Sequence, residues 1–182
     1  MSAPSVASPL QVHTLGPEGT NCEAAARHWL ARRGETDAVV VLHPTLEKAV
    51  VDVLAAPADS VLLACVVYPN LHEIVFKNLR DMQMSDCFVM PTHHMVFAGR
   101  EGGPQRTVAS HPAPVNLLDD RSLEFTIVNS NSEAAITCAA GRTDTCITTL
   151  PAARQHGLDV LVDFGAVPMG FSVHAPAPRA SE

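Results

Sequence analysis

The chain has 182 residues, a formal net charge of −7 and a hydrophobic content of 47%. That hydrophobic content excludes a wholly disordered chain, and the length suits one domain or two small lobes that share a core. The acidic charge argues against nucleic acid or an anionic membrane as the main partner, because phosphate groups select basic surfaces. A small anionic substrate is compatible with this charge if a local site overrides the field of the whole protein.

The cysteines and the N-terminal segment indicate a cytoplasmic protein. The five cysteines are odd in number and form no CxxC pair, which is typical of a reduced protein. The first residues have neither the basic nor the apolar region of a signal peptide. No apolar run approaches the roughly 20 residues of a membrane span. We expect residues 1–10 and 176–182 to be disordered.

The first half of the chain alternates short apolar runs with helical patterns. The expected strands are Val12–Leu15, Ala38–Leu42 and Ser60–Tyr68. The expected helices run from Thr20 to about Arg33, from Pro44 to about Ala56 and from Leu71 to Gln83. This order predicts a parallel sheet covered by helices.

The second half repeats the α/β pattern after an extended segment, Phe88–Gly99, in which Pro91 forbids a helix interior. Further expected strands are Thr107–Pro112, Leu123–Val128, the run TCITT, the run LDVLVDFG and the run FSVHA, with helices at 114–120, 130–141 and 150–156. We therefore predict an α/β fold with two lobes and a cleft between them. Residues 11–90 plus 160–175 would form lobe 1, and residues 91–159 would form lobe 2.

The stretch HTLGPEGTNCEAAA carries a glycine-rich turn into a helix start. Such a turn exposes backbone N–H groups and the positive end of the helix dipole, which together bind anions. No Lys-Ser/Thr pair follows Gly19, so the loop is not a nucleotide-binding P-loop. The alternative is a tight turn in which Thr20 only caps the helix.

A second polar helix start, NSNSEAA, spans Asn129–Ala135. Ser130 and Glu133 have the spacing of a capping box, so this segment can also be read as a well-capped helix and nothing more. One such helix start in each lobe favours the functional reading. The two could face each other across the cleft and hold two anionic groups of one ligand.

Two histidine segments are also candidates for the site. His111 lies in the rigid loop SHPAPVN, and His93 and His94 are neighbours in the extended segment, where at most one can face a cleft. No histidine and cysteine spacing favours a metal site, and no Ser-His-Asp order or nucleophile elbow is present. We expect no metal.

Taken together, LGPEGTNCEAAA, SHPAPVN, IVNSNSEAA and CITTLPAARQHGLDV resemble the prephenate dehydratase catalytic domain, in the same order and from Val12 to Ala175. The resemblance implies a two-lobed fold like that of type 2 periplasmic binding proteins. The chain departs from the dehydratases in three ways. It reads YPNLHEI where they have Pro-x-Glu-Asn-Ser, Met169-Gly170-Phe171 where they have Thr-Arg-Phe, and it lacks their regulatory domain.

These departures are similar to those of the BacA-type prephenate decarboxylases of bacilysin-like antibiotic pathways. The resemblance implies a cofactor-independent carbon-carbon lyase that removes CO₂ from prephenate without aromatising the ring. Its partner would be a small dicarboxylate, and a homodimer is possible. The alternatives are a dehydratase-like enzyme and a non-catalytic carboxylate-binding module. The candidate catalytic residues are His111, Thr148 and Thr149, and the candidate substrate-binding residues are Gly19, Thr20, Asn21, Ser110, Asn129, Ser130, Asn131, Ser132, Met169, Gly170 and Phe171.

Overall fold

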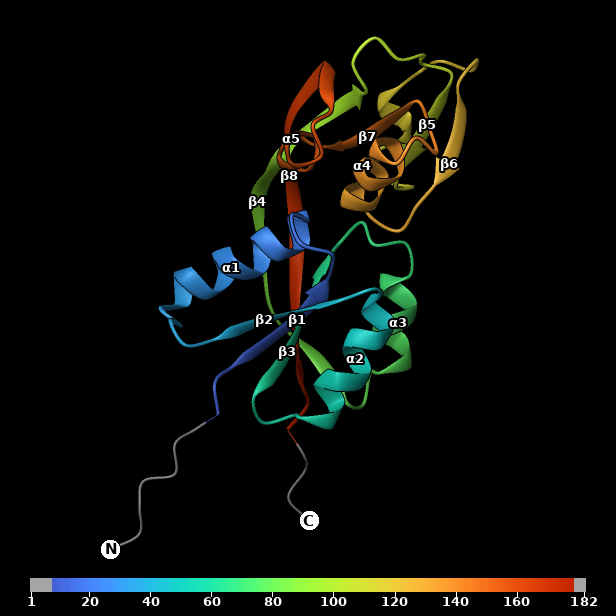
Figure 1. Ribbon diagram of the computed structural model, residues 1–182. Helices are drawn as coiled ribbons and strands as arrows, with labels where there is room; N and C mark the ends of the chain where they lie inside the picture. Colours follow the sequence, from blue (N-terminus) through green and yellow to red (C-terminus); the bar gives the residue numbers. More distant parts are fainter. Residues whose placement is uncertain (1–7, 179–182) are drawn as a thin grey trace, which may run out of the picture.

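The computed structural model describes residues 8–178, so most of the two terminal segments predicted to be disordered lies outside it. One mixed sheet runs through the whole chain with the strand order β2-β1-β3-β8-β4-β7-β5-β6 (Figure 1). The strands are β1 (Gln11–Leu15), β2 (Val39–His43), β3 (Ser60–Cys65), β4 (Met82–Gly99), β5 (Thr107–Ser110), β6 (Glu124–Ile127), β7 (Thr145–Thr149) and β8 (Asp159–Pro176). The helices are α1 (Asn21–Arg33), α2 (Leu46–Ala55), α3 (Leu71–Lys77), η1 (Val115–Leu117, a 3-10 turn), α4 (Asn131–Ala139) and α5 (Leu150–Gln155).

The lower lobe in Figure 1 is built on strands β1, β2 and β3, which pair in parallel with β1 in the middle. The apolar residues of these strands and of α1, α2 and α3 form one core with residues of β4 and β8, such as Phe88 and Phe171. Helix α1 ends where Gly34 adopts a left-handed conformation with φ of 71°, which agrees with the helix end expected at about Arg33.

The upper lobe repeats this arrangement with β5 between β6 and β7, again in parallel. Helices α4 and α5 pack on it through small side chains, including Ala134, Ala135 and Ala152. A separate group around Met95, Phe97 and Ile147 fills the opposite side of the sheet. Each lobe therefore has its own core, while the lobe boundaries given above stay a prediction.

Strands β4 and β8 run antiparallel between the lobes, and each is 18 residues long (Figure 1). Pro91 faces Pro168 in this pair, and the register then shifts before His94 pairs with Ala166. Proline has no N–H to donate, so the ladder is weakest at this point. The Thr92 hydroxyl bridges the irregular step by accepting a hydrogen bond from the Val167 N–H at 3.2 Å.

The structure bears out the α/β class and the two-lobed plan, with three local differences. The two strands predicted at the end of the chain are one strand, β8. Helix α3 ends at Lys77 instead of continuing to Gln83, because the Asn78 side chain donates to the Ile74 carbonyl and the chain turns into β4. The helix predicted at 114–120 is the single turn η1. No helix among residues 8–178 is long and apolar enough to cross a membrane.

Candidate active site

A cavity of about 330 Å³ lies between the two lobes. Lobe 1 and the crossing strands line it with Leu15, Thr20, Asn21, Cys22, Cys65, Val67, Tyr68, Thr92, Met95, Val167 and Met169. Lobe 2 lines it with His111, Ala113, Pro114, Asn116, Leu117, Ser130 and Asn131. Both predicted helix starts therefore reach one cavity, which is the arrangement that the sequence suggested.

The start of α1 is held by a closed set of hydrogen bonds. Thr20 Oγ1 accepts from the Glu23 N–H at 3.2 Å, and the Glu23 carboxylate accepts from the Gly19 N–H at 2.7 Å. The Asn21 side-chain oxygen accepts from the His93 N–H at 3.0 Å, which ties this helix to β4. Arg27 pairs with Glu23 and not with the cavity.

The start of α4 repeats the same local pattern. Ser130 Oγ accepts from the Glu133 N–H at 3.0 Å, and the Glu133 carboxylate accepts from the Asn129 N–H at 2.9 Å. The sequence shows this repeat as T-N-C-E-A-A and S-N-S-E-A-A, the two helix starts that were predicted to face each other. Two helix N-termini of the same design thus face one cavity.

The two helix starts differ in how well their polar atoms are satisfied. Among residues 8–178, Asn131 Oδ1 and Ser132 Oγ are buried without a hydrogen-bond partner. The only side-chain contact found for the Asn131 amide nitrogen is the Met95 sulfur at 3.8 Å, a weak acceptor. The Asn131 amide can therefore turn toward a ligand while losing no more than its weak contact to Met95.

The loop before α1 also approaches α4. A Cβ atom added at Gly19, whose φ is 80°, would lie 3.8 Å from Ser132 Oγ. Glycine is therefore favoured here for its positive φ, while the added Cβ would meet Ser132 only at an ordinary van der Waals distance. Ser132 lies at this contact and does not line the cavity.

His111 follows β5 and has a defined neutral tautomer. Its Nδ1 accepts from the Ala113 N–H at 3.2 Å, so the proton of the neutral ring is on Nε2. Burial lowers the pKa of His111 below its ordinary value. The ring is thus neutral in the empty site near pH 7, and its protonated form is a stronger acid than an exposed histidine.

The electrostatics of the cavity depend on helix ends and not on charged side chains. Among the described residues, no lysine or arginine lines it. Positive potential must therefore come from the N-termini of α1 and α4 and from the exposed N–H groups there. The remaining surface is largely apolar, with Val67, Met95, Val167 and Met169 on the side of the crossing strands.

Thr92 and Tyr68 are two of the cavity residues that were not among the predicted site residues. Thr92 is buried at the step in β4, and Tyr68 follows β3. The Tyr68 hydroxyl donates to Glu47 at 2.8 Å, and burial together with this carboxylate raises the pKa of Tyr68 to about 12. Tyr68 and His111 also line a neighbouring cavity of about 160 Å³. No sequence motif marks either residue, because their positions follow from how β3 and β4 end and bend.

Six predicted residues line the cavity, namely Thr20, Asn21, His111, Ser130, Asn131 and Met169, and the others do not. Thr148 and Thr149 are both 0% exposed, so neither hydroxyl can reach a substrate. Thr148 donates to the Asn131 carbonyl at 2.6 Å, and Thr149 caps α5. Their predicted catalytic role is not supported, since strand β7 directs them into the core.

The remaining predicted residues lie near the cavity without lining it. Ser110 and Phe171 are buried, Gly19 lies at the contact of the lobes, and Asn129 lines the neighbouring cavity. Gly170 faces the other side of β8, where an added Cβ would lie 3.1 Å from Val66 Cγ2. Successive residues of a strand point to opposite faces, so only Met169 of the Met-Gly pair faces the cavity.

The fold and the cleft define this chain as a two-lobed α/β protein of the type 2 periplasmic-binding-protein class. It is similar to GqqA, described as a novel type of quorum quenching acylase, with a TM-score of 0.63 and 14% identity over 93% of this chain, although it spans only 65% of that protein. It is also similar to the periplasmic VFT2 domain of Bordetella pertussis BvgS, with a TM-score of 0.55 and 16% identity over 92% of this chain and 80% of that domain. At these identities the likeness shows the fold alone.

Relatives by sequence are more specific. A prephenate decarboxylase of Bacillus subtilis is 29% identical over 93% of this chain and 88% of its own length. A prephenate decarboxylase of Planktothrix agardhii is 27% identical over 90% and 87%. A prephenate dehydratase of Amycolatopsis methanolica is 31% identical over 81% of this chain but 50% of its own length. A scan against family models finds no match. The resemblance to BacA-type prephenate decarboxylases is confirmed by these relatives.

Proposed function

We propose that this chain removes CO₂ from prephenate and leaves the ring non-aromatic. The observation that carries the proposal is a cleft in which Met169 lines the wall and which, among residues 8–178, has two helix N-termini and one histidine but no lysine or arginine. Relatives covering about nine tenths of the chain are named prephenate decarboxylase. The antibiotic or other secondary-metabolite context, a cytoplasmic location and a homodimer are further parts of this proposal. The location is supported by five free cysteines.

In this proposal the pyruvyl carboxylate of prephenate binds at the start of α4. The Asn131 side chain can turn its amide nitrogen from the Met95 sulfur toward the carboxylate, and the first N–H groups of the helix point the same way. The favourable helix dipole supplies charge stabilisation without arginine or lysine. Binding of this one group fixes the orientation of the ring.

The ring carboxylate would then lie against the apolar wall around Val67 and Met169. When its C–C bond breaks, CO₂ leaves, the bonding electrons shift through the ring double bond, and a ring carbon takes up one proton. The negative charge of this carboxylate disappears from the apolar region during the step. Reaction is therefore favoured relative to the bound ground state, as in catalysis by desolvation.

The proton is proposed to come from His111. A neutral imidazole is a poor acid, so the step requires its protonated form, and the charge of a bound dianion favours that form. The low pKa of His111 in the empty site then becomes useful, because the imidazolium is a strong acid once formed. Release of the hydroxyl is suppressed because Met169 cannot donate a proton.

The direct test is incubation of the pure protein with prephenate while CO₂ release and product absorbance are followed together. One CO₂ per substrate without the absorbance of an aromatic keto acid is the expected result. Stoichiometric phenylpyruvate would favour the dehydratase alternative. Binding by calorimetry with prephenate recovered unchanged, after correction for spontaneous decay, would favour the non-catalytic carboxylate-binding module.

A further inference from the structure

A second group of chemically competent side chains lies outside the cleft. His13 on β1, His43 at the end of β2 and Asp52 on α2 offer ligand atoms that all lie within 4.8 Å of one another. His13 and His43 are 4% and 8% exposed, whereas the Asp52 side chain is 59% exposed. The cluster is thus buried on the side of the sheet and open to water on the side of the helix.

No arrangement of protons on the two neutral rings satisfies the hydrogen bonding of these three side chains. His13 Nδ1 lies 2.8 Å from His43 Nε2, and one of the two must donate to the other. If His13 donates, its Nε2 is a buried acceptor, and no partner for it exists among the described residues. If His43 donates, the lone pair of its Nδ1 faces the Asp52 carboxylate, 3.7 Å away. A cation between the rings removes the conflict over the shared proton.

The ligand set suits a particular class of ion. Two neutral imidazoles and a carboxylate are the ligands preferred by zinc and neighbouring divalent transition metals. Tetrahedral zinc with Zn–N bonds of about 2.0–2.1 Å needs nitrogen atoms roughly 3.3 Å apart. The rings must therefore separate by about half an ångström from their present 2.8 Å, which small side-chain rotations can supply.

We propose that His13, His43 and Asp52 form a zinc-binding site, with water as the fourth ligand. The site joins β1, β2 and α2, three elements that otherwise meet only through apolar packing and backbone pairing. His43 is followed by Pro44 and Thr45, which line the smaller cavity at the mouth of the cleft. The bound ion would hold this turn and stabilise lobe 1, and it takes no part in the proposed decarboxylation.

The test uses the full untagged chain, freed of metal by a chelator and then dialysed. Zinc chloride alone is titrated by calorimetry, and thermal unfolding is followed with and without zinc. We expect one ion per chain and a rise of roughly 5–10 °C in the unfolding midpoint at a hundredfold excess of free zinc over its dissociation constant. Asp52→Asn, at an exposed position, should keep the fold and weaken zinc binding by about tenfold or more.

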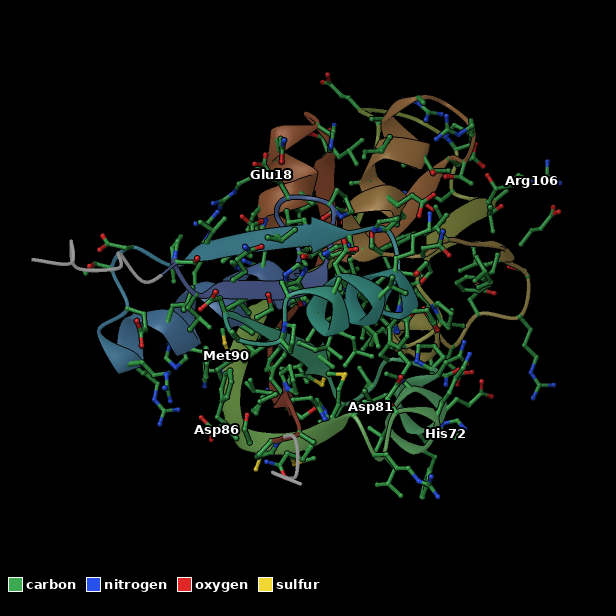
Figure 2. All side chains as sticks on the ribbon, turned by 90° about the horizontal axis from the view of Figure 1, so that it is seen from below. Glu18, His72, Asp81, Asp86, Met90 and Arg106 are labelled. Atoms are coloured by element: carbon green, nitrogen blue, oxygen red, sulfur yellow. The ribbon has the colours of Figure 1, made fainter. Side chains whose placement is uncertain are left out.

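His43→Gln provides a second variant, and His72→Gln is the matched control. His72 is an exposed residue of helix α3 (Figure 2), which carries none of the three proposed ligands, so its loss should leave zinc binding unchanged. Cobalt binding separates this site from the five cysteines, because thiolate ligation gives a strong charge-transfer band and imidazole with carboxylate does not. Absence of stoichiometric zinc binding, or binding that neither Asp52→Asn nor His43→Gln weakens, would overturn the proposal.

Discussion

The helix starts on the two walls of the cleft have the same sequence pattern, but they differ in which buried polar atoms lack a hydrogen-bond partner. In lobe 1, the α1 start is closed, since Asn21 accepts from His93 and the next residue, Cys22, is a buried thiol whose pKa burial raises to about 12. In lobe 2, Asn131 and Ser132 keep buried oxygen atoms without partners. His111, the only histidine that lines the cavity in the described part of the chain, also belongs to lobe 2.

This difference suggests that one helix start has a structural role and the other a binding role, although their sequences match. A satisfied polar group costs little to bury and holds its neighbours in place, whereas an unsatisfied group gains most when a ligand arrives. Lobe 1 therefore supplies shape, the tie to β4 and the apolar wall. Lobe 2 supplies the groups that would bind charge and transfer the proton. The following variants test whether this division holds.

The largest effect is expected for His111→Phe. Removal of a general acid lowers turnover by about 10²–10⁴-fold, while the Michaelis constant should change little because His111 is not the main carboxylate ligand. In the wild type, kcat/KM should fall tenfold per pH unit between about pH 7 and 9, since only the protonated ring is active and burial lowers its pKa in the free protein.

Steady-state kinetics over this pH range provides the measurement for both proteins. The residual activity of His111→Phe should be independent of pH, because water then provides the proton. If the wild type and the variant share one pH profile, the proton comes from another group and the role of lobe 2 is smaller than proposed.

Asn131→Ala and Asn21→Ala compare the two helix starts directly. Loss of a hydrogen bond to a charged group costs about 1.5–3 kcal/mol, so Asn131→Ala should lower kcat/KM by roughly 10–100-fold, chiefly through the Michaelis constant. Asn21→Ala removes the tie to the His93 N–H and should mainly lower stability. Steady-state kinetics and urea unfolding of both variants measure these two effects. Equal kinetic losses in both variants would mean that the ligand uses the two starts alike.

The sequence was sufficient for most elements and for the helix starts of α1 and α4, because these are local patterns. The strand at Val12, the cap at Thr20 and the stop at Gly34 depend only on neighbouring residues. The sequence was insufficient where the position of a side chain depends on strands that pair over long distances in the chain. Thr148 and Thr149 looked available as polar residues at a strand end, but β7 lies inside the sheet and buries both. The His13 and His43 pair was also invisible, since thirty positions separate the two residues and parallel pairing of β1 with β2 brings them together.

A smaller effect is expected at the apolar wall of lobe 1. Met169→Thr introduces a hydroxyl where the ring is expected to lie, so decarboxylation should slow by about tenfold and some phenylpyruvate should form. Met90 pairs with Met169 across β4 and β8 but does not line the cavity, so Met90→Thr is the matched control. Product analysis by chromatography distinguishes the two. An arginine at position 170 is not part of this test, because Val66 occupies the space beside Gly170.

The smallest effect concerns stability in acid and again contrasts the lobes. Burial lowers the pKa values of His13, His43 and His174 in lobe 1 and of His111 in lobe 2. As the pH falls, histidines of the unfolded chain bind protons near their ordinary pKa of about 6.5, before those of the folded chain do. The contribution of these histidines to the free energy of unfolding is therefore complete above that pH. It is lost as the pH falls toward the lower pKa values of the folded protein. Each histidine contributes a slope of up to about 1.4 kcal/mol per pH unit in this window. Urea unfolding between pH 5 and 8, with a chelator present, measures the slope. His111→Phe should lower this slope by no more than the share of one histidine, and His72→Gln should leave it unchanged, because three of the four histidines lie in lobe 1.

If the free energy of unfolding of His111→Phe did not depend on pH in this range, the acid sensitivity would belong to the cleft instead.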